Sequence, residues 1–339
     1  MKKIKVEKAV GSVLAHDVTR IVPGEFKGVA FKKGHIVRAR DIAELKQIGK
    51  NHLYVFELTP DKLHEDDAAV RICAAICGEQ IAWTQPVEGK SSMRAKTAGL
   101  LKVDADALLR INSLDDIIVS TLKNNTPCAR DQIVAATRII PLTTELARIE
   151  RLETIAGASQ PILKVLPFRL CQVGAVVTGT EVYQGVIHDG FDEFVKPTIT
   201  RYGSEVVDKQ IVPDNTRAIA GAIEHLAQRG CDLIVTTGGL SVDPDDVTKA
   251  GILETGAQVL AYGAPVLPGA MFLYALYDDI PILGLPACVY YHQVTIFNLL
   301  LPRILAGETL SSTDIVSMGH GGLCQDCAEC RYPVCPFGK

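Results

Sequence analysis

The first 60 residues alternate short apolar stretches with turn residues, a pattern typical of a small β-rich domain. A helix is predicted to begin at Asp41 and to end at Gly49, because glycine commonly follows the last turn of a helix. A strand is predicted over residues 53–56. We therefore expect a small β-rich N-terminal domain over residues 1–60.

Helical spacing opens the next segment, residues 61–166. A helix that ends at Gly78 carries apolar residues at intervals of three and four, namely Ala69, Ile72, Cys73 and Ile76. Strand-like runs follow at 117–122 and 133–140, before another helix near 144–155. Pro161 and Pro167 indicate a junction, so we expect residues 61–166 to form an α+β middle domain.

Strands and helices alternate from residue 170 onward. Strands are predicted at 173–177, 206–212, 233–235, 258–261 and 282–285, with helices near 192–202, 219–226, from 247 and over 290–305. Such alternation is the sign of a parallel sheet covered by helices. We therefore predict a three-layer α/β domain with a mostly parallel sheet over residues 167–310.

The most informative stretch is CDLIVTTGGLSVDPDDVT, residues 231–248. A buried strand ends there in two hydroxyl residues and two glycines, after which hydroxyl and carboxylate side chains follow. These positions are Thr236, Thr237, Gly238, Gly239, Ser241, Asp243, Asp245 and Asp246. Paired glycines let a backbone turn sharply and approach a ligand, and successive N–H groups in such a turn form an anion site.

Carboxylates beside an anion site are typical of a divalent cation that bridges them to a phosphate. The alternative is an ordinary glycine turn followed by a solvated, acidic start of a helix. The combination of strand, hydroxyls and carboxylates favours the phosphate site.

Two more polar clusters follow strands of the same predicted sheet. Thr178, Gly179, Thr180 and Glu181 come after one strand, and Asp214 comes after the next. In open α/β sheets, ligands bind beyond the carboxyl ends of the strands. We therefore expect these residues and the glycine turn to meet at one site.

Ten cysteines are many for 339 residues, and their positions divide them into two groups. Six are scattered, and free cysteine is usually a small buried apolar residue. The six are Cys73, Cys77, Cys128, Cys171, Cys231 and Cys288. The other four are Cys324, Cys327, Cys330 and Cys335, with the spacing C-x2-C-x2-C-x4-C followed by proline. In a reducing cytosol this density indicates a thiolate metal site rather than disulfides.

The spacing of the four tail cysteines leaves two metals open. Zinc ribbons usually separate two C-x2-C pairs by about fifteen residues or more, a gap that this tail lacks. The run is closer to iron–sulfur ligation, although its last interval is four residues and that of bacterial ferredoxins is three. Serine and glycine are frequent over 311–323. We therefore expect residues 311–339 to form a flexible, cysteine-rich metal-binding tail that the preceding domain does not need for folding.

Composition narrows the class of partner. The net charge is −4 and hydrophobic residues make up 47% of the chain, which is typical of globular proteins. A negative chain is a poor general ligand for nucleic acid or an anionic membrane. The N-terminus lacks an apolar signal core, and no run of about eighteen apolar residues occurs. We therefore expect a soluble, cytoplasmic protein.

Residues from about 170 to 307 resemble the molybdopterin-binding domain shared by molybdopterin adenylyltransferases and molybdopterin molybdotransferases. The matching stretches are VTGTEV, HDG, VPDNTRAI, CDLIVTTGGLSVDPDDVTK, VLPGAMF and GLPAC. The resemblance implies a pterin-dithiolene ligand with its terminal phosphate near the glycine turn. It also implies Mg²⁺, with Asp214 and Asp246 as the catalytic acidic residues. The implied pterin contacts are Thr178, Gly179, Glu181, Asp189, Thr236, Thr237, Gly238, Gly239, Ser241, Pro268, Gly269, Leu285 and Pro286.

Both aspartates also have a structural interpretation. Asp214 precedes a predicted helix and suits an N-cap. Asp246 could likewise be a cap, or a first-turn carboxylate that complements the helix dipole. The resemblance favours the functional role for both.

The chain departs from the family pattern at positions concerned with metal insertion. The molybdotransferases place lysines around the later Pro-Gly turn, whereas VLPGAM here is uncharged. Their Leu-Pro-Gly-Asn-Pro loop is replaced by Leu285-Pro286-Ala287-Cys288-Val289. Thr180 stands where members tend to carry aspartate, and Phe191 stands where asparagine is usual. Pterin recognition is thus better supported than metal insertion.

Two functions therefore stay open. One is a transferase of late molybdenum or tungsten cofactor assembly, with ATP or molybdate as the second substrate, in which positioning and a metal ion carry most of the catalysis. The other is a non-catalytic carrier or sensor of the pterin cofactor that serves a molybdoenzyme client. The two aspartates favour the transferase, and the uncharged loop and the cysteine tail favour the carrier. We expect a homo-oligomer in either case.

Overall fold

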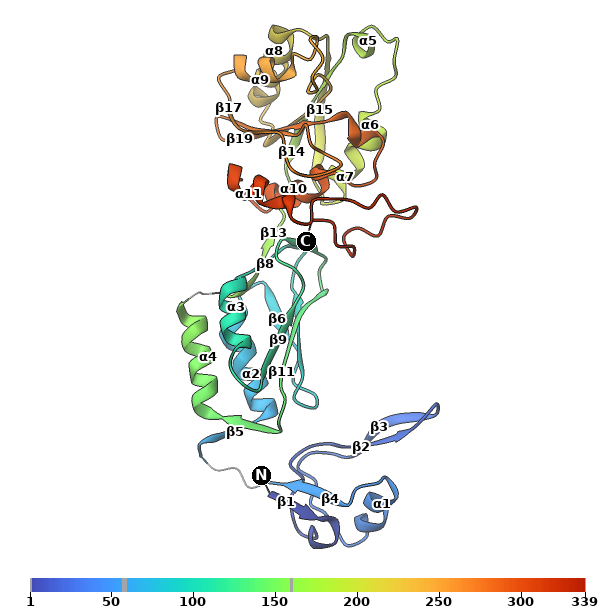
Figure 1. Ribbon diagram of the computed structural model, residues 1–339, viewed down its shortest axis with the longest axis vertical. Helices are drawn as coiled ribbons and strands as arrows, with labels where there is room; N and C mark the ends of the chain where they lie inside the picture. The colour runs from blue at the N-terminus through green and yellow to red at the C-terminus, as the bar shows by residue number, and fades with distance from the viewer. Residues whose placement is uncertain (1, 57–59, 159–160, 339) are drawn as a thin grey trace. The chain divides into compact units, whose positions relative to one another are not determined.

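The computed structural model describes residues 2–56, 60–158 and 161–338, which fall into two compact units (Figure 1). The first unit takes Met1–Thr97, Leu101–Asn124 and Cys128–Val165, and the second takes Ala98–Leu100, Asn125–Pro127 and Leu166–Lys339. Residues 57–59, which belong to the first predicted segment, lie outside the described residues. Among the described residues, no helix is both long and apolar enough to cross a bilayer.

The first unit begins with two small antiparallel pairs of strands. Its elements are β1 (Lys2–Lys5), η1 (Val6–Lys8), β2 (Val18–Val22), β3 (Phe26–Phe31), α1 (Asp41–Gln47) and β4 (His52–Val55). β1 pairs with β4, and β2 pairs with β3. Val6, Leu14, Leu45 and Leu53 are buried together in a small core. The predicted helix from Asp41 and the strand after it are confirmed.

The remainder of this unit contains a four-stranded antiparallel sheet in the order β6-β7-β11-β9, which shares one core with the helices. The elements between residues 62 and 167 are β5 (Lys62–His64), α2 (Glu65–Ile76), β6 (Ile81–Trp83), β7 (Ser91–Ala95), β8 (Gly99–Val103), α3 (Ala105–Asn112), β9 (Ile117–Thr121), β10 (Thr126–Cys128), β11 (Ile133–Ile139), β12 (Thr143–Glu145), α4 (Leu146–Ala158) and β13 (Leu163–Pro167). The residues of β8, β10 and β13 are divided between the two units. The predicted helical spacing of Ile72, Cys73 and Ile76 on α2 is confirmed, since all three are fully buried. The sequence pattern missed α3, whose N-cap is Asp104.

A six-stranded sheet organises the second unit, in the order β15-β14-β16-β19-β18-β17. The strands are β14 (Gln172–Thr178), β15 (Glu205–Val212), β16 (Leu233–Thr237), β17 (Gln258–Tyr262), β18 (Leu273–Tyr277) and β19 (Ile280–Leu285). The first four in this order are parallel, and β18 runs antiparallel to both of its neighbours, β19 and β17. The predicted α/β class with a mostly parallel sheet is confirmed.

Helices cover both faces of this sheet, which gives three layers (Figure 1). The helices are α5 (Thr180–Tyr183), α6 (Phe191–Phe194), α7 (Lys196–Thr200), α8 (Thr216–Gln228), α9 (Thr248–Glu254), η2 (Ala287–Tyr290), α10 (Ile296–Leu305), α11 (Ser312–Val316) and η3 (Ser317–Gly319). One face packs on α8 and α9 through Val176 and Ile234. The other face packs on α6, α7, α10 and α11 through Val173, Ala175 and Val235. Alternate strand residues thus reach opposite layers, as the pleat requires.

Two predicted helices differ from the observed ones. The helix expected over 192–202 is divided into α6 and α7, because Pro197 has no N–H to continue the first helix and instead occupies the first turn of the second. The helix expected over 290–305 begins only at Ile296. Thr295 and Asn298 form a capping box there. The Thr295 side chain accepts the backbone N–H of Asn298, and the Asn298 side chain accepts the backbone N–H of Thr295.

The segment after Gly307 packs on the domain. Leu310, Ile315 and Phe337 are buried in the same core as α10 and the sheet. Tyr332 donates its hydroxyl to the carbonyl of Asn298 at 2.9 Å. The sequence predicted a flexible connection over 311–323, whereas the structure forms α11 and η3 there, because a capping box at Ser311 and Asp314 starts a helix.

Because of this packing, we expect the domain to depend on its tail. Replacement of Phe337 by alanine should lower the free energy of unfolding by about 3 kcal/mol, the usual cost of truncating a buried phenylalanine. Phe337 is 3% exposed, whereas Val334 is 86% exposed, so Val334→Ala is the matched control. Urea denaturation of both variants measures the difference. Equal stability of the two variants would show that the tail is not part of the core.

A second prediction concerns pH. Burial opposes ionisation of Asp314, but hydrogen bonds from Arg303 and Ser311 outweigh it and lower the pKa of Asp314 to about 2. The ionised side chain therefore adds stability that is present above its unfolded pKa of about 3.9 and is lost as pH falls toward 2. Since the Asp314 side chain is 35% exposed, solvent screening reduces this contribution to about 1 kcal/mol. Asp314→Asn should cost that amount at pH 7 and little at pH 2.5 in urea denaturation, and a cost independent of pH would contradict the assignment.

Candidate functional site

The candidate site lies at the carboxyl ends of β14, β15 and β16. β15, the next strand along the chain, lies on one side of β14, and β16 lies on the other side. This reversal is a topological switch point, where open α/β sheets bind ligands. The chain segments that leave these three strands carry Thr178–Glu181, Asp214 and the glycine turn.

Hydrogen bonds tie the first of these segments to the glycine turn. Thr178 donates its hydroxyl to the Thr237 carbonyl at 3.2 Å, and its oxygen lies 3.0 Å from the hydroxyl of Thr248. Thr248 donates its hydroxyl to the carbonyl of Gly238 at 2.9 Å, and its backbone N–H donates to Gly239 at 3.1 Å. Thr178 and Thr248 are almost fully buried. The end of β14, the turn after β16 and the start of α9 therefore form one connected unit.

Both glycines of the turn adopt a left-handed backbone, with φ of +89° at Gly238 and +59° at Gly239. A side chain would also collide, since a Cβ on Gly238 would lie 2.3 Å from the Thr178 carbonyl oxygen and one on Gly239 would lie 2.4 Å from the Thr248 hydroxyl. Only glycine satisfies both conditions.

The turn presents hydrogen-bond donors that have no partner. Within the part of the chain that the structure describes, the backbone N–H groups of Gly239, Leu240 and Ser241 donate to no backbone or side-chain acceptor. Three successive N–H groups after such a turn are suited to an anion. Ser241 is exposed and adds a hydroxyl at the same place.

Two buried hydroxyls precede the turn. Thr236 and Thr237 are 0% exposed, and among the described residues neither side-chain oxygen has a partner at full hydrogen-bond geometry, although the Thr237 hydroxyl interacts with that of Tyr290. An unpaired buried hydroxyl costs about 1–3 kcal/mol, so its presence at a strand end calls for a water or a ligand group.

Asp214 holds the loop after β14. Its carboxylate accepts the backbone N–H of Thr180 at 2.8 Å and the Thr180 hydroxyl at 3.1 Å. The cap of α8 is instead Asn215, whose side chain accepts the N–H of Ala218. The interpretation of Asp214 as an N-cap is therefore wrong, and the residue fixes the position of the Thr180–Glu181 segment. Glu181 itself is exposed.

The three carboxylates after the turn mainly organise their own loop. Asp246 accepts the N–H of Asp243 at 3.3 Å, and Asp243 accepts the N–H of Asp245 at 3.0 Å. Asp246 is partly buried, and the other two are exposed. Asp246 does not cap α9, since the N-cap position is Val247, without a side-chain cap. In the described residues no three acidic, histidine or cysteine side chains converge as a metal ion would require.

Asp189 contacts other residues of the protein and stabilises the local fold. It accepts the N–H of Phe191 at 2.8 Å, which starts α6, and it pairs with Lys209 at 2.6 Å. Burial opposes the charge on Lys209, but Asp189 and Asp192 raise the pKa of Lys209 above its ordinary value. Lys209 and Asp189 line an open cavity of about 680 Å³ beside the Thr180–Glu181 segment.

The two later loops lie on the α10 side of the domain. Gly269 is buried against Ile296, and the carbonyl of Pro268 accepts the N–H of Ile296 at 3.2 Å. Leu285 is fully buried in the core, and Pro286 precedes η2. Pro268 and Gly269 thus support the start of α10, whereas Leu285 pairs in the parallel sheet with Thr237, directly before the glycine turn.

The sequence interpretation missed two cationic groups near the site. Lys209 lies inside a predicted strand, between Asp208 and Gln210, and belongs to none of the recognised motifs. Lys249 lies 4.2 Å above the ring of Tyr262, whose hydroxyl donates to the carbonyl of Leu240 at 2.9 Å. Lys249 ends the DPDDVTK motif and lies on the first turn of α9. This position could have identified it from the sequence as a cationic residue close to the glycine turn.

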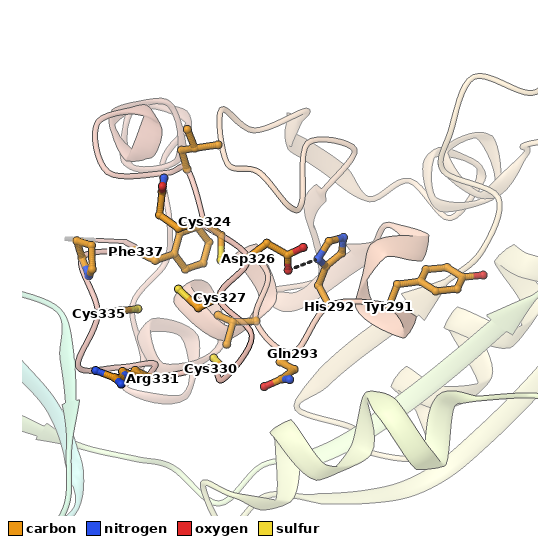
Figure 2. Close-up of a pocket in the computed structure, with 14 residues that line it drawn as sticks. Tyr291, His292, Gln293, Cys324, Asp326, Cys327, Cys330, Arg331, Cys335 and Phe337 are labelled. Atoms are coloured by element: carbon orange, nitrogen blue, oxygen red, sulfur yellow. Dashed lines mark ion pairs between the residues drawn. The ribbon is translucent and has the colours of Figure 1, made fainter.

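The tail thiols gather at a separate pocket, which Figure 2 shows. Cys324, Cys327, Cys330 and Cys335 all line it. Cys324 and Cys335 are partly buried, and Cys327 and Cys330 are exposed. The predicted ligand set is therefore brought to one cavity, although among the described residues its sulfurs do not converge on a single point.

The glycine turn yields a direct test of the Thr178–Thr248 unit. Gly239→Ala should lower the free energy of unfolding by about 2–3 kcal/mol, because it combines a left-handed backbone with displacement of the Thr248 hydroxyl. Gly256→Ala is the control, since Gly256 has φ of +84° and nothing within 4 Å of its Cβ position. The control should cost about 1 kcal/mol. If denaturant titration gives equal losses, the hydrogen-bonded unit does not stabilise the turn.

Comparison with known proteins places these features in a family. Residues 174–306 match the sequence model described as a probable molybdopterin binding domain, and residues 3–57 match a domain of unknown function. The molybdopterin molybdenumtransferase of Haemophilus influenzae is 32% identical over 154 residues, which cover 43% of this chain and 38% of that protein. A CinA-like protein of Mycobacterium avium is 38% identical over 95 residues, which cover 28% of this chain and 22% of that protein. The chain thus spans well under half of the curated relatives it matches.

Solved structures include a protein that is similar to part of this chain. The molybdopterin biosynthesis enzyme MoaB from Thermus thermophilus is 22% identical, with a TM-score of 0.32 over 42% of this chain and 98% of that chain. The family match by sequence includes the Gly238-Gly239 turn, Asp214 and both later loops. By sequence, residues 174–306 therefore match the family described as a probable molybdopterin binding domain.

Proposed function

We propose that the protein binds molybdopterin and acts in the assembly of the molybdenum or tungsten cofactor. The observation that carries this proposal is the row of N–H groups at Gly239, Leu240 and Ser241, which have no partner among the described residues and lie at the switch point of the family-matched domain. The name of the Haemophilus influenzae relative supports the same pathway. We assign the phosphate of the pterin to these donors.

The chemistry of the site fits a phosphate. Backbone N–H groups and hydroxyls are neutral donors, so they hold an oxyanion without a buried counter-charge. The buried hydroxyls of Thr236 and Thr237 would gain a full hydrogen-bond partner in a bound ligand or its ordered water. Lys249 contacts the ring of Tyr262, whose hydroxyl bonds to the Leu240–Ser241 segment, and it would supply a positive charge there.

As the finer step, we assign a transferase reaction with ATP or molybdate as the second substrate. Mg²⁺ usually takes one or two protein carboxylates together with phosphate oxygens, so the absence of a three-residue cluster among the described residues is compatible with it. Asp246, which is partly buried and next to the turn, is the carboxylate that we assign to the metal ion. Mg²⁺ would neutralise charge that develops on the phosphate oxygens.

Asp214 has a different role in this proposal. Because its carboxylate accepts both the N–H and the hydroxyl of Thr180, it acts through that segment rather than on the substrate. Asp214 is thus a positioning residue for Thr180 and Glu181, which flank the ligand.

One observation favours the alternative, a carrier or sensor of the finished cofactor. The loop that contains Pro268 and Gly269 has no charged residue to receive an oxyanion of molybdenum. Its backbone is instead bonded to the tail, where Cys324 donates its N–H to Leu267 at 2.8 Å. In this alternative the tail cysteines hold a metal centre, iron–sulfur or zinc, and contact a molybdoenzyme client. A cytoplasmic location and a homo-oligomeric state are parts of both proposals.

Asp246→Asn separates the transferase from the carrier. We expect molybdopterin affinity within about twofold of wild type, since the phosphate donors remain, and turnover reduced about 100-fold or more, since the metal-dependent stabilisation of the transition state is lost. Asp245→Asn is the control, because Asp245 is exposed and changes the local charge equally. Anaerobic binding titrations and assays with ATP or molybdate give both quantities.

Three outcomes decide among the proposals. Wild-type protein that binds molybdopterin but turns over neither second substrate establishes the carrier. Turnover that survives Asp246→Asn removes this residue from catalysis. Folded wild-type protein without affinity for molybdopterin overturns the proposed function.

A further inference from the structure

The four tail thiols surround one cavity of about 130 Å³ (Figure 2). A single water needs about 10–15 Å³ on this measure, so the cavity has room for a group of several atoms. Val294 and Phe337, which also line it, are buried, whereas Cys327 and Cys330 are exposed. The cavity therefore has a fixed, apolar wall and an accessible edge.

The four thiols line the cavity, but among the described residues they do not converge on one point. Zinc needs four ligands about 2.3 Å from one point, with tetrahedral geometry. In the described residues no three potential ligands approach one position in that way. A cubane cluster is bound differently, since each thiolate ligates a separate iron at the periphery of a larger body. Four thiols distributed around a cavity thus match a cluster better than a single ion.

One neighbour at the same cavity, Arg331, suits an anionic group. Asp326 also lines the cavity, and its carboxylate oxygen lies 3.6 Å from Nδ1 of His292 (Figure 2). Four thiolates give an iron–sulfur cluster a net negative charge, which a guanidinium at the rim would partly offset. Arg331 directly follows Cys330, so the sequence places this charge beside a ligand.

Two chain segments connect this cavity to the loops near the proposed pterin site. Leu267 donates its N–H to the Gly322 carbonyl at 2.8 Å and accepts the N–H of Cys324 at 2.8 Å. Leu267 immediately precedes the Pro268-Gly269 turn. On the other side of the cavity, Tyr291–Val294 follows η2, which begins directly after Pro286. Both later loops of the matched domain therefore continue into the cavity wall.

We propose that this thiol pocket binds a [4Fe–4S] cluster through Cys324, Cys327, Cys330 and Cys335, and that cluster loading and molybdopterin binding are coupled through the Leu267–Gly269 and Pro286–Val294 loops. The second half of this inference rests on the proposed function, and the first half does not. Coupling is reciprocal, so the cluster changes pterin affinity by the same factor by which the pterin changes cluster affinity.

The first experiment tests the cluster in the full-length chain. The apoprotein is incubated anaerobically with equimolar ferrous and ferric iron and with sulfide, and unbound ions are removed. We expect about four iron and four sulfide per chain, with broad visible absorbance. Cys327→Ala should lose most of both, and because Cys327 is exposed its removal spares the core. Cys77→Ser in the other unit is the matched control and should load as wild type.

Two kinds of result would overturn this part of the proposal. One zinc per chain with no iron or sulfide, or four tail thiols that titrate as free after incubation, would overturn the cluster. Loading of Cys327→Ala equal to that of Cys77→Ser would overturn the ligand set.

The second experiment tests the coupling with molybdopterin as the probe. Its dissociation constant is measured for apo and cluster-loaded protein, and we expect a difference of about fivefold or more. Equal affinities would overturn the coupling and leave the cluster site in place. If neither form binds molybdopterin, the proposed function fails, and iron and sulfide analysis still decides the cluster independently.

Discussion

The contact between Thr178 and Thr248 is the constraint on which the candidate site depends. It joins a residue at the end of β14 to the first residue of α9, and Thr248 also binds the carbonyl of Gly238. The two hydroxyls occupy the space that a side chain on Gly239 would need. With that space filled, the N–H groups after the turn face away from the protein's own acceptors. Glycine is thus required here for packing as much as for backbone freedom.

The sequence predicted the site better than its surroundings, and the reason is physical. Polar residues and glycines after buried strands form short local patterns, so the glycine turn and Asp214 could be recognised from adjacent residues alone. The role of Asp214 could not be, because its partner Thr180 lies 34 positions away. A good N-cap residue, Asn215, stood directly beside it and took the expected cap.

Longer-range packing explains the other differences. The pattern missed α3 because only Ala107 and Ile111 of that short helix are buried apolar positions, too few to reveal a period. The start of α10 was placed too early because 290–294 contains no glycine or proline that would interrupt a helix, and the capping box at Thr295 and Asn298 decides the boundary. The glycines and serines of 311–323 suggested flexibility by composition. Leu310 and Ile315 nevertheless pack into the same core as α10, and this packing orders the segment despite its composition.

The tail also determines at what point during synthesis the second unit can complete its fold. The apolar cluster on the α10 side of the sheet takes residues from Val173 to Phe337, so its last contributor is synthesised more than 160 residues after its first. Domains generally fold as units during synthesis, at about 5–20 residues per second. The first unit has its complete core once residue 165 is made, whereas the core of the second is complete only after Phe337 has left the ribosome. During that interval the sheet would expose the apolar surface that Leu310, Ile315 and Phe337 later cover, so the second unit is open to aggregation for longer than the first.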